Sequence, residues 1–290
     1  MKPAPFRYVA ARTLDQALQL KAEHGDEARF LAGGQSLVPT MNFRLTQPAM
    51  LIDINPLVGL AGLAKVESGA VCIGALTRYG VLERDPAVAR DLPLIHEALP
   101  HIAHPQIRNR STIGGNLAHA DPASEMPAIV LALGGKLRAQ SVRGDRWIDA
   151  GDFFAGALST TLEPDEMLTA VELPVSQPGS GACFMEVSRR RGDFAIIGVA
   201  CTLTLDADGS CTGAQIGLCN AGDGPVFATE ACEALVGHPV DAAAIEAAAE
   251  RVRSAIDPGG SIHGSKEFQR HIAGVLTART LAVANERARQ

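Results

Sequence analysis

The sequence predicts an α+β protein, and three observations support this fold class. The glycine pair Gly33-Gly34 lies between a strand-like run and a helical segment, as in a small α/β unit. A β-branched run over 195–205, the turn 206–209 and a strand-like return over 214–219 predict an antiparallel hairpin. Helical patterns fill most of the chain after that hairpin, so the C-terminal part combines an antiparallel sheet with helices.

The first region, residues 1–56, is expected to form a small α/β subdomain. Residues Thr13 to Gln16 resemble a capping box, which starts an amphipathic helix that Gly25 ends. Pro39 is compatible with a helix around it because it lies in the first turn, where its missing N–H is not needed. The other elements expected here are strands over 28–31 and 50–54 and a helix over 37–44.

The second region, residues 57–176, is expected to form a larger α/β subdomain. Thr77 is expected to cap a short helix, and Gly134-Gly135 to end a helix over 125–133. The other elements expected here are strands over 71–75 and 168–173, a hairpin of 137–142 with 146–148, and a helix over 92–103.

A segment rich in Pro, Gly and Ser, residues 174–181, is the best linker candidate, and the third region, 177–290, begins within it. A chain of 290 residues has room for two or three such units. The helices expected after the C-terminal hairpin cover 228–236, 242–256 and 265–289.

Composition excludes several classes of function. The net charge is −6, aromatic residues make up 4% and no long basic run occurs, so the chain lacks the features of a nucleic-acid-binding protein. No apolar run is long enough to span a bilayer, and the N-terminus has no apolar signal core, so a cytoplasmic protein is expected. The one basic cluster, Arg189-Arg190-Arg191, fits either a solvated patch or a docking or ligand-side role.

The cysteines predict neither a disulfide framework nor a metal centre. None of the six forms a C-x-x-C pair, and iron–sulfur clusters and structural zinc need clustered thiolates. We therefore expect no metal site in this chain and interpret all six as buried small hydrophobic residues. They are Cys72, Cys183, Cys201, Cys211, Cys219 and Cys232.

Two glycine turns are the candidate ligand sites. In the first, glycines permit close approach of a ligand to the backbone, and Ser36 is expected to cap a helix start that favours an anion. A plain Gly-Gly loop is the alternative interpretation. The second turn, Gly114-Gly115, has hydroxyl, amide and carboxylate neighbours. Two such turns predict one extended ligand, such as a diphosphate with bulky ends, that is held from two sides.

These motifs carry a family resemblance. The pair A-G-G-Q-S-L-x-P over 32–39 and T-I-G-G-N-x-A-H-x-D-P over 112–122 resembles the FAD-binding medium subunit of molybdenum hydroxylases. That family includes the flavoprotein subunits of aerobic carbon monoxide dehydrogenase and the FAD domain of xanthine dehydrogenase. A third stretch, 184–196, and the C-terminal residues 265–271 agree with it. The resemblance implies FAD-binding subdomains of the vanillyl-alcohol-oxidase type and a C-terminal domain like that of the carbon monoxide dehydrogenase flavoprotein.

The resemblance also implies which residues contact FAD. The first motif would bind the diphosphate from one side, and the second would bind it from the other side. His119 and Asp121 would lie along the flavin's linker, Glu125 by the adenosine ribose, and Asp193 beside the ring system. The full implied set is Ala32, Gly33, Gly34, Gln35, Ser36, Leu37, Ile107, Thr112, Gly114, Gly115, Asn116, His119, Asp121, Glu125, Leu168, Asp193 and Phe194.

Some positions depart from the family or have a plainer interpretation. Phe194 stands where carbon monoxide dehydrogenase relatives often have Tyr, and Met185 where some relatives have Lys. His101 and His104 lie near prolines and fit loop or capping roles, and Asp53 ends a strand and fits a turn or capping group. No set of catalytic side chains is expected, because a flavin would perform the redox chemistry.

The resemblance implies an electron-transfer subunit. A large molybdenum subunit would hydroxylate the substrate, and a small subunit with [2Fe–2S] clusters would pass electrons to FAD in this chain and on to an external acceptor. A dimer of such three-subunit units is the expected assembly. The alternatives are an independent flavin oxidoreductase and a nucleotide-binding scaffold without redox activity. Neither glycine turn spells G-x-G-x-x-G, and no G-K-[ST] occurs, which disfavours a Rossmann dehydrogenase and a P-loop protein.

Overall fold

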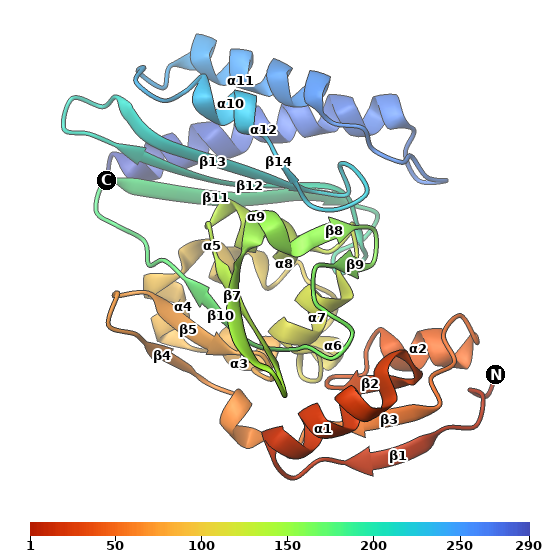
Figure 1. Ribbon diagram of the computed structural model, residues 1–290. Helices are drawn as coiled ribbons and strands as arrows, with labels where there is room; N and C mark the ends of the chain where they lie inside the picture. Colours follow the sequence, from red (N-terminus) through yellow and green to blue (C-terminus); the bar gives the residue numbers. More distant parts are fainter.

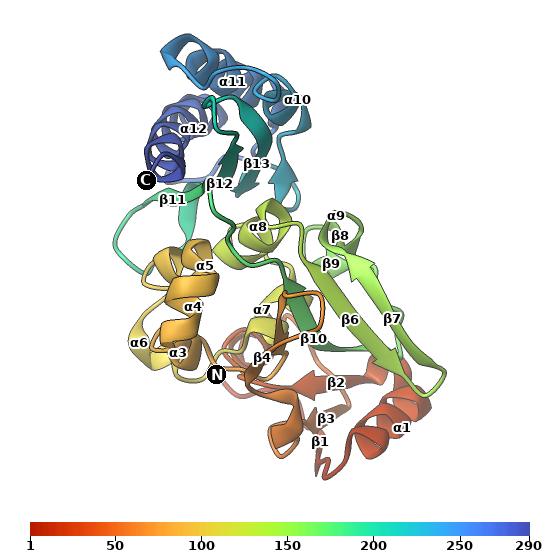
Figure 2. The ribbon, with the colours of Figure 1, turned by 90° about the vertical axis from the view of Figure 1, so that its left-hand side faces the viewer.

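Three main β-sheets follow one another along the chain, each with helices packed against it (Figure 1). The computed structural model describes residues 1–290. Turned by 90°, the molecule shows the third sheet and its helices at one end, the second sheet in the middle and the first sheet at the other end (Figure 2). This mixture of small sheets and helices confirms the α+β class.

The first sheet has the order β1-β3-β2, and its strands are parallel. Because β2 and β3 run in the same direction, their carboxyl ends lie at one edge, where ligand sites of parallel sheets are found. The expected strands and helices of this region are present, and β1 is an addition. The bounds are β1 (Arg7–Ala10), α1 (Leu14–His24), β2 (Ala28–Leu31), α2 (Leu37–Asn42) and β3 (Met50–Asp53).

The second sheet has the order β4-β5-β10-β6-β7, and each neighbouring pair is antiparallel. Its strands are β4 (Leu63–Lys65), β5 (Val71–Gly74), β6 (Lys136–Ser141), β7 (Gly144–Asp149) and β10 (Met167–Leu173). A small two-stranded sheet joins β8 (Phe154–Gly156) and β9 (Ser159–Thr160). The helices of this region are α3 (Tyr79–Leu82), α4 (Pro86–Asp91), α5 (Pro93–Ala98), α6 (Pro105–Arg108), α7 (Ile113–His119), α8 (Glu125–Ala132) and α9 (Ala150–Phe153).

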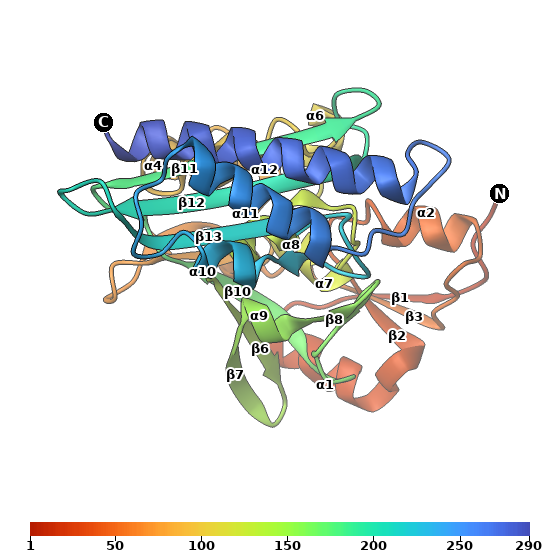
Figure 3. The ribbon, with the colours of Figure 1, turned by 90° about the horizontal axis from the view of Figure 1, so that it is seen from above.

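The third sheet is antiparallel with the order β11-β12-β13-β14. Seen from above, α11 and α12 lie over this sheet (Figure 3). Its opposite face packs on α5 and α8 of the second region. The bounds are β11 (Ser180–Ser188), β12 (Ala195–Leu205), β13 (Cys211–Cys219), β14 (Val226–Phe227), α10 (Thr229–Glu233), α11 (Ala242–Ala255) and α12 (Lys266–Ala288).

Several local expectations need correction. Thr13 does accept the N–H of Gln16, but the Gln16 side chain accepts the N–H of Arg12 rather than that of Thr13. Ser36 precedes α2 without a side-chain capping bond, because its backbone is already helical. Thr77 does not cap α3; its hydroxyl bonds the backbone of Gly62 and Gly74. Arg78 stands at the N-cap position instead.

Candidate functional site

The two glycine motifs lie against each other, although they are far apart in the sequence. A Cβ atom built on Gly33 would lie 2.5 Å from the carbonyl oxygen of Arg110 and 2.8 Å from Cα of Ser111. A Cβ atom built on Gly115 would lie 3.7 Å from Cβ of Ala32. The absence of a side chain at Gly33 therefore lets the first motif reach the backbone that leads into the second.

The first motif presents free backbone donors. Gly34 adopts a φ of +73°, which favours glycine, and the chain turns there from β2 toward α2. The side chain of Gln35 donates to the carbonyl of Gly33 at 3.1 Å. The backbone N–H groups of residues 33–36 donate to no other group of the chain. Consecutive free N–H groups at a turn form a binding site for an anion such as a phosphate.

The second motif is a helix rather than a turn. Thr112 caps α7 by accepting the N–H of Gly115 at 3.1 Å, and Gly114 lies inside the first helical turn. A Cβ atom on Gly114 would lie 2.4 Å from Cβ of Ala75, so this glycine serves close packing. The N–H groups of residues 113–116 all have acceptors within the chain. The sequence did not reveal this difference, because glycine pairs favour turns by composition alone.

A cavity of about 510 Å³ opens at the first motif and connects the ends of β2 and β3. Arg110, from the segment before α7, forms one wall. Tyr8, Asn55 and Arg110 were not predicted from the sequence, and Asp53 was assigned only a turn or capping role. The lining residues are Tyr8, Leu31, Ala32, Gly33, Gly34, Gln35, Val38, Pro39, Asp53, Asn55 and Arg110.

A hydrogen-bonded cluster fixes the carboxylate in this cavity. Tyr8 Oη donates to Asp53 Oδ2 at 2.5 Å, and the backbone N–H of Asn55 donates to Asp53 Oδ1 at 3.0 Å. Arg78 donates to the side chain of Asn55 and to the carbonyl of Arg110. Burial opposes ionisation of Asp53, but these hydrogen bonds and the charge of Arg78 hold its pKa below the usual value. Asp53 is therefore an ionised acceptor beside the free N–H groups.

The polar residues after α7 mainly shape their own loop. The Asn116 side chain donates to Ser124 Oγ at 2.8 Å, and Asp121 accepts the N–H of Ala123 at 3.0 Å. His119 is half-buried, and its ring makes no hydrogen bond within the chain. Because its ring is free of protein partners, His119 is available to a ligand.

The third motif packs on the loop before α6. Gly192 has a φ of +85°, and a Cβ atom there would lie 2.8 Å from Nδ1 of His104 and 2.9 Å from the carbonyl oxygen of Ala103. Asp193 accepts from Nε of Arg190 at 3.2 Å, and Phe194 is 67% exposed. His104 stands at the N-cap position of α6 without a side-chain capping bond, so the loop role expected for it is confirmed.

Three further residues of the implied set, and Met185, which stands outside that set, are buried or half-buried. Thr112 and Leu168 are almost inaccessible, and Ile107 is half-buried in α6, where its carbonyl accepts from Ser111. Met185 packs against the apolar core between the third sheet and its helices. None of these four residues lines the cavity at the first motif.

Glu125 is the most unusual titratable group near the second motif. It lies in the first turn of α8 and is 4% exposed. Burial, followed by the charges of Glu186 and Asp121, raises the pKa of Glu125 to about 8. The carboxyl group is therefore protonated at neutral pH in the folded chain.

This pKa predicts a pH dependence of stability. Unfolding would return Glu125 to its ordinary pKa of 4.5, so its contribution is fully present below that value and is lost as the pH rises toward 8. Between about pH 5 and pH 8, the free energy of unfolding should fall by up to about 1.4 kcal/mol per pH unit. Denaturant unfolding should show a smaller fall for Glu125→Gln. An equal fall in both proteins would assign the effect to another group.

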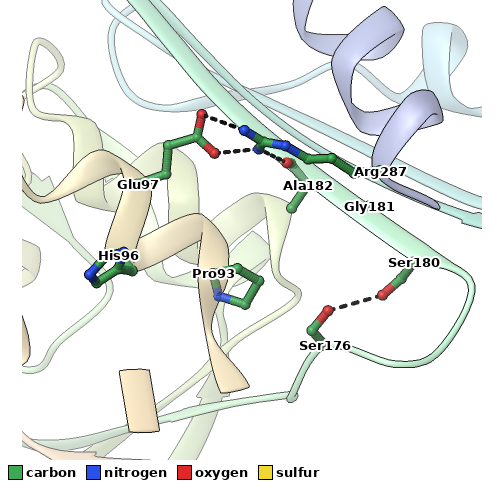
Figure 4. Close-up of a pocket in the computed structure, with 8 residues that line it drawn as sticks. All are labelled: Pro93, His96, Glu97, Ser176, Ser180, Gly181, Ala182 and Arg287. Atoms are coloured by element: carbon green, nitrogen blue, oxygen red, sulfur yellow. Dashed lines mark hydrogen bonds and ion pairs between the residues drawn. The ribbon is translucent and has the colours of Figure 1, made fainter. Parts of the chain in front are cut away.

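A second cavity, of about 460 Å³, lies at the seam between α5, β11 and α12 (Figure 4). Its arginine, Arg287, is paired with Glu97 at 2.5 Å and also donates to the carbonyl of Ala182. No residue of the glycine motifs lines this cavity. Because its cation is already neutralised, we assign this cavity a structural role between the second and third regions.

The chain contains no group of three or more His, Cys, Asp and Glu side chains that could hold a metal ion. Five of the six cysteines are buried as expected, whereas Cys72, on β5 between β4 and β10, is half-buried. Burial raises the pKa of Cys232 to about 11, so its thiol is neutral. No helix is long and apolar enough to cross a membrane.

Comparisons with known proteins agree with this arrangement over the whole chain. The family described as "FAD binding domain in molybdopterin dehydrogenase" matches residues 4–176, and "CO dehydrogenase flavoprotein C-terminal domain" matches residues 182–284. The alpha subunit of the 6-hydroxypseudooxynicotine dehydrogenase complex of Paenarthrobacter nicotinovorans is 42% identical, covering 100% of this chain and 97% of its own length.

Two carbon monoxide dehydrogenases extend the similarity to structure. The medium chain from Afipia carboxidovorans is 37% identical, with 100% of both chains covered. The solved carbon monoxide dehydrogenase from Hydrogenophaga pseudoflava superposes with a TM-score of 0.96 at 34% identity, covering 99% of each chain. The chain therefore belongs to the family of FAD-binding medium subunits of molybdenum hydroxylases.

Proposed function

We propose that this chain binds FAD at the first glycine motif and passes electrons from the [2Fe–2S] clusters of a small partner subunit to an external acceptor. The observation that carries the proposal is the row of free N–H groups over residues 33–36, beside the segment that leads into α7. When bound, FAD would supply the redox chemistry. The chain supplies binding, orientation and charge.

The residues present fit a dinucleotide. Free N–H groups suit the diphosphate, and the space left by the missing side chain of Gly33 is occupied by backbone, so the motif is held in a fixed shape. Asp53 offers a carboxylate to ribose hydroxyls in the same cavity, and Asn55 fixes the orientation of that carboxylate. Arg110 adds a positive charge to the same cavity.

The implied contacts divide into an open set and a buried set. Residues 32–37 would bind the diphosphate, together with Gly115 and Asn116, which are at least partly exposed. Thr112 and Gly114 are buried and would support them from behind. His119, Asp121, Asp193 and Phe194 are at least partly exposed and would flank the linker and the ring system. Ile107, Glu125 and Leu168 lie deeper and would shape the site from behind these groups.

We further propose that residues 1–56, 57–176 and 177–290 are the three units of the chain, because each range contains one main sheet. The partners would be a small [2Fe–2S] subunit and a large molybdenum subunit, assembled as a dimer of heterotrimers in the cytoplasm. The family comparisons support a multi-subunit complex, since one relative is a subunit of a dehydrogenase complex and another is a medium chain.

The proposal predicts a difference between the isolated chain and the complex. The chain purified alone and given FAD should show a flavin spectrum, but a substrate of the molybdenum subunit should not bleach it. The co-expressed complex should show added iron–sulfur absorbance, and the same substrate should bleach its flavin. Bleaching of the isolated chain by that substrate would favour an independent flavin oxidoreductase. A chain that stays colourless with FAD would favour the scaffold alternative.

A further inference from the structure

The two sides of the cavity at the first glycine motif come from different regions of the chain, and Arg78 connects them. No hydrogen bond joins residues 32–36 directly to the segment 109–112 that packs against them. Apart from the chain connection at 54–58, the only hydrogen bond between residues 1–56 and 57–176 runs from the Arg78 guanidinium to Oδ1 of Asn55. The same guanidinium donates to the carbonyl of Arg110 on the other side.

The backbone at Arg78 is itself fixed to the start of α7. Arg78 forms an isolated antiparallel bridge with Thr112, and the N–H of Ile113 donates to the carbonyl of Thr77 at 3.1 Å. The side chain of Arg78 is half-buried and does not line the cavity. Any effect of Arg78 on a ligand must therefore pass through the groups to which it donates.

Asn55 carries this contact to the backbone of the first motif. Its Nδ2 donates to the carbonyl of Ala32 at 2.9 Å, to the carbonyl of Leu31 at 3.3 Å and to Asp53 Oδ1 at 2.5 Å. A trans peptide unit is planar, so its C=O and N–H groups point in opposite directions. Because the carbonyl of Ala32 is held toward Asn55, the N–H of Gly33 in the same peptide unit is directed away from Asn55. That N–H is the first of the four free donors over residues 33–36.

Arg78 determines which end of the Asn55 amide faces the motif. A guanidinium has donors only, so it requires the amide oxygen and leaves the NH₂ group for the carbonyl of Ala32 and for Asp53. The opposite orientation would set the amide oxygen against a carbonyl and a carboxylate, and would leave Arg78 facing a donor. The planar fork of arginine also suits two separate acceptors, here the side chain of Asn55 and the carbonyl of Arg110.

We propose that Arg78 is a positioning residue for the diphosphate of the dinucleotide. Through Asn55 it orients the Ala32–Gly33 peptide unit, and through the carbonyl of Arg110 it holds this unit in register with the segment that leads into α7. We call this pair of contacts the Arg78–Asn55 bridge. The role of the bridge in FAD binding rests on the proposed function.

Fluorescence titration of the full chain with FAD tests this role. Arg78→Ala should lower the affinity for FAD about tenfold, because the free N–H of Gly33 loses its fixed direction. Millimolar guanidinium ion should restore most of that loss, since it can occupy the vacated position and donate to the same two acceptors. Arg146→Ala is the matched control. Arg146 pairs with Glu166 at 2.8 Å and does not line the cavity, so this variant should bind FAD as the wild type does and should not respond to guanidinium.

Two further variants separate the geometry of the bridge from the charge of Arg78. Arg78→Lys keeps the charge but lacks the planar fork, so it should recover only part of the affinity. In an Asn55→Ala background, Arg78→Ala should lower the affinity by much less than tenfold, because both side chains act on the same peptide unit. Circular dichroism of each variant checks that the secondary structure is retained.

Three results would overturn the bridge and leave the proposed function standing. Wild-type affinity in Arg78→Ala would show that FAD binding does not depend on Arg78. Wild-type affinity in Arg78→Lys would show that a positive charge alone suffices. An equal loss on Arg78→Ala with and without Asn55 would show that the two side chains act independently. Failure of the wild-type chain itself to bind FAD would instead overturn the proposed function, and this inference with it.

Discussion

Gly33→Val is expected to lower the affinity for FAD by at least about 100-fold, which corresponds to roughly 2.7 kcal/mol. The smallest side chain at this position would place Cβ 2.5 Å from the carbonyl oxygen of Arg110. That atom belongs to backbone, so it cannot move aside as a flexible side chain could. The first motif must shift instead, and the row of free N–H groups loses its orientation toward the diphosphate. Fluorescence titration of the isolated chain with FAD measures the change.

A matched glycine separates this effect from a general loss of folding. Gly59 has no atom within 4 Å of a built Cβ atom and has no positive φ, so Gly59→Val should bind FAD as the wild type does. Circular dichroism should show that both variants retain their secondary structure. Unchanged FAD affinity in Gly33→Val would place the diphosphate elsewhere and would remove the main support for the proposed site.

Much of the fold could be predicted from the hydrophobic periodicity and from the turn and capping residues that bound each element. The strand β12 covers 195–205 as predicted, because a β-branched run bounded by turn residues is typical of a strand. Helices α11 and α12 begin directly after Asp241 and Ser265, which cap them through side-chain oxygens. The edge strand β1 was missed because its residues are mostly exposed and show no alternation of burial.

The site was predictable only where chemistry is local. Gly33 and Gly34 were found because a turn after a strand is visible in sequence. Tyr8 and Arg110 could not be found, because they reach the cavity through strand order and loop packing, which no short window of sequence specifies. The character of α7 was missed because glycine is a poor helix former, and packing against Ala75 overrides that preference.

Gly217→Val should separate the second and third regions and reduce the free energy of unfolding by about 1–3 kcal/mol or more, the usual range for overpacking. Gly217 lies on β13, where a Cβ atom would fall 2.3 Å from the carbonyl oxygen of Ala128 in α8. The helix is itself part of the core of the second region, so neither partner has room to retreat. Denaturant unfolding should therefore show a lower midpoint, and loss of two-state behaviour is expected if the regions separate first.

Gly213 provides the comparison on the same strand. Its nearest neighbour is the side chain of Thr204 at 3.9 Å, so Gly213→Val adds the same volume without a clash. Valine also has a higher strand propensity than glycine, so Gly213→Val should leave the free energy of unfolding unchanged or slightly raised. If both substitutions lower the free energy of unfolding equally, the close approach of α8 to β13 makes no particular contribution to stability. A loss confined to Gly217→Val, together with weaker FAD binding, would show that the seam between these regions holds the dinucleotide site in shape.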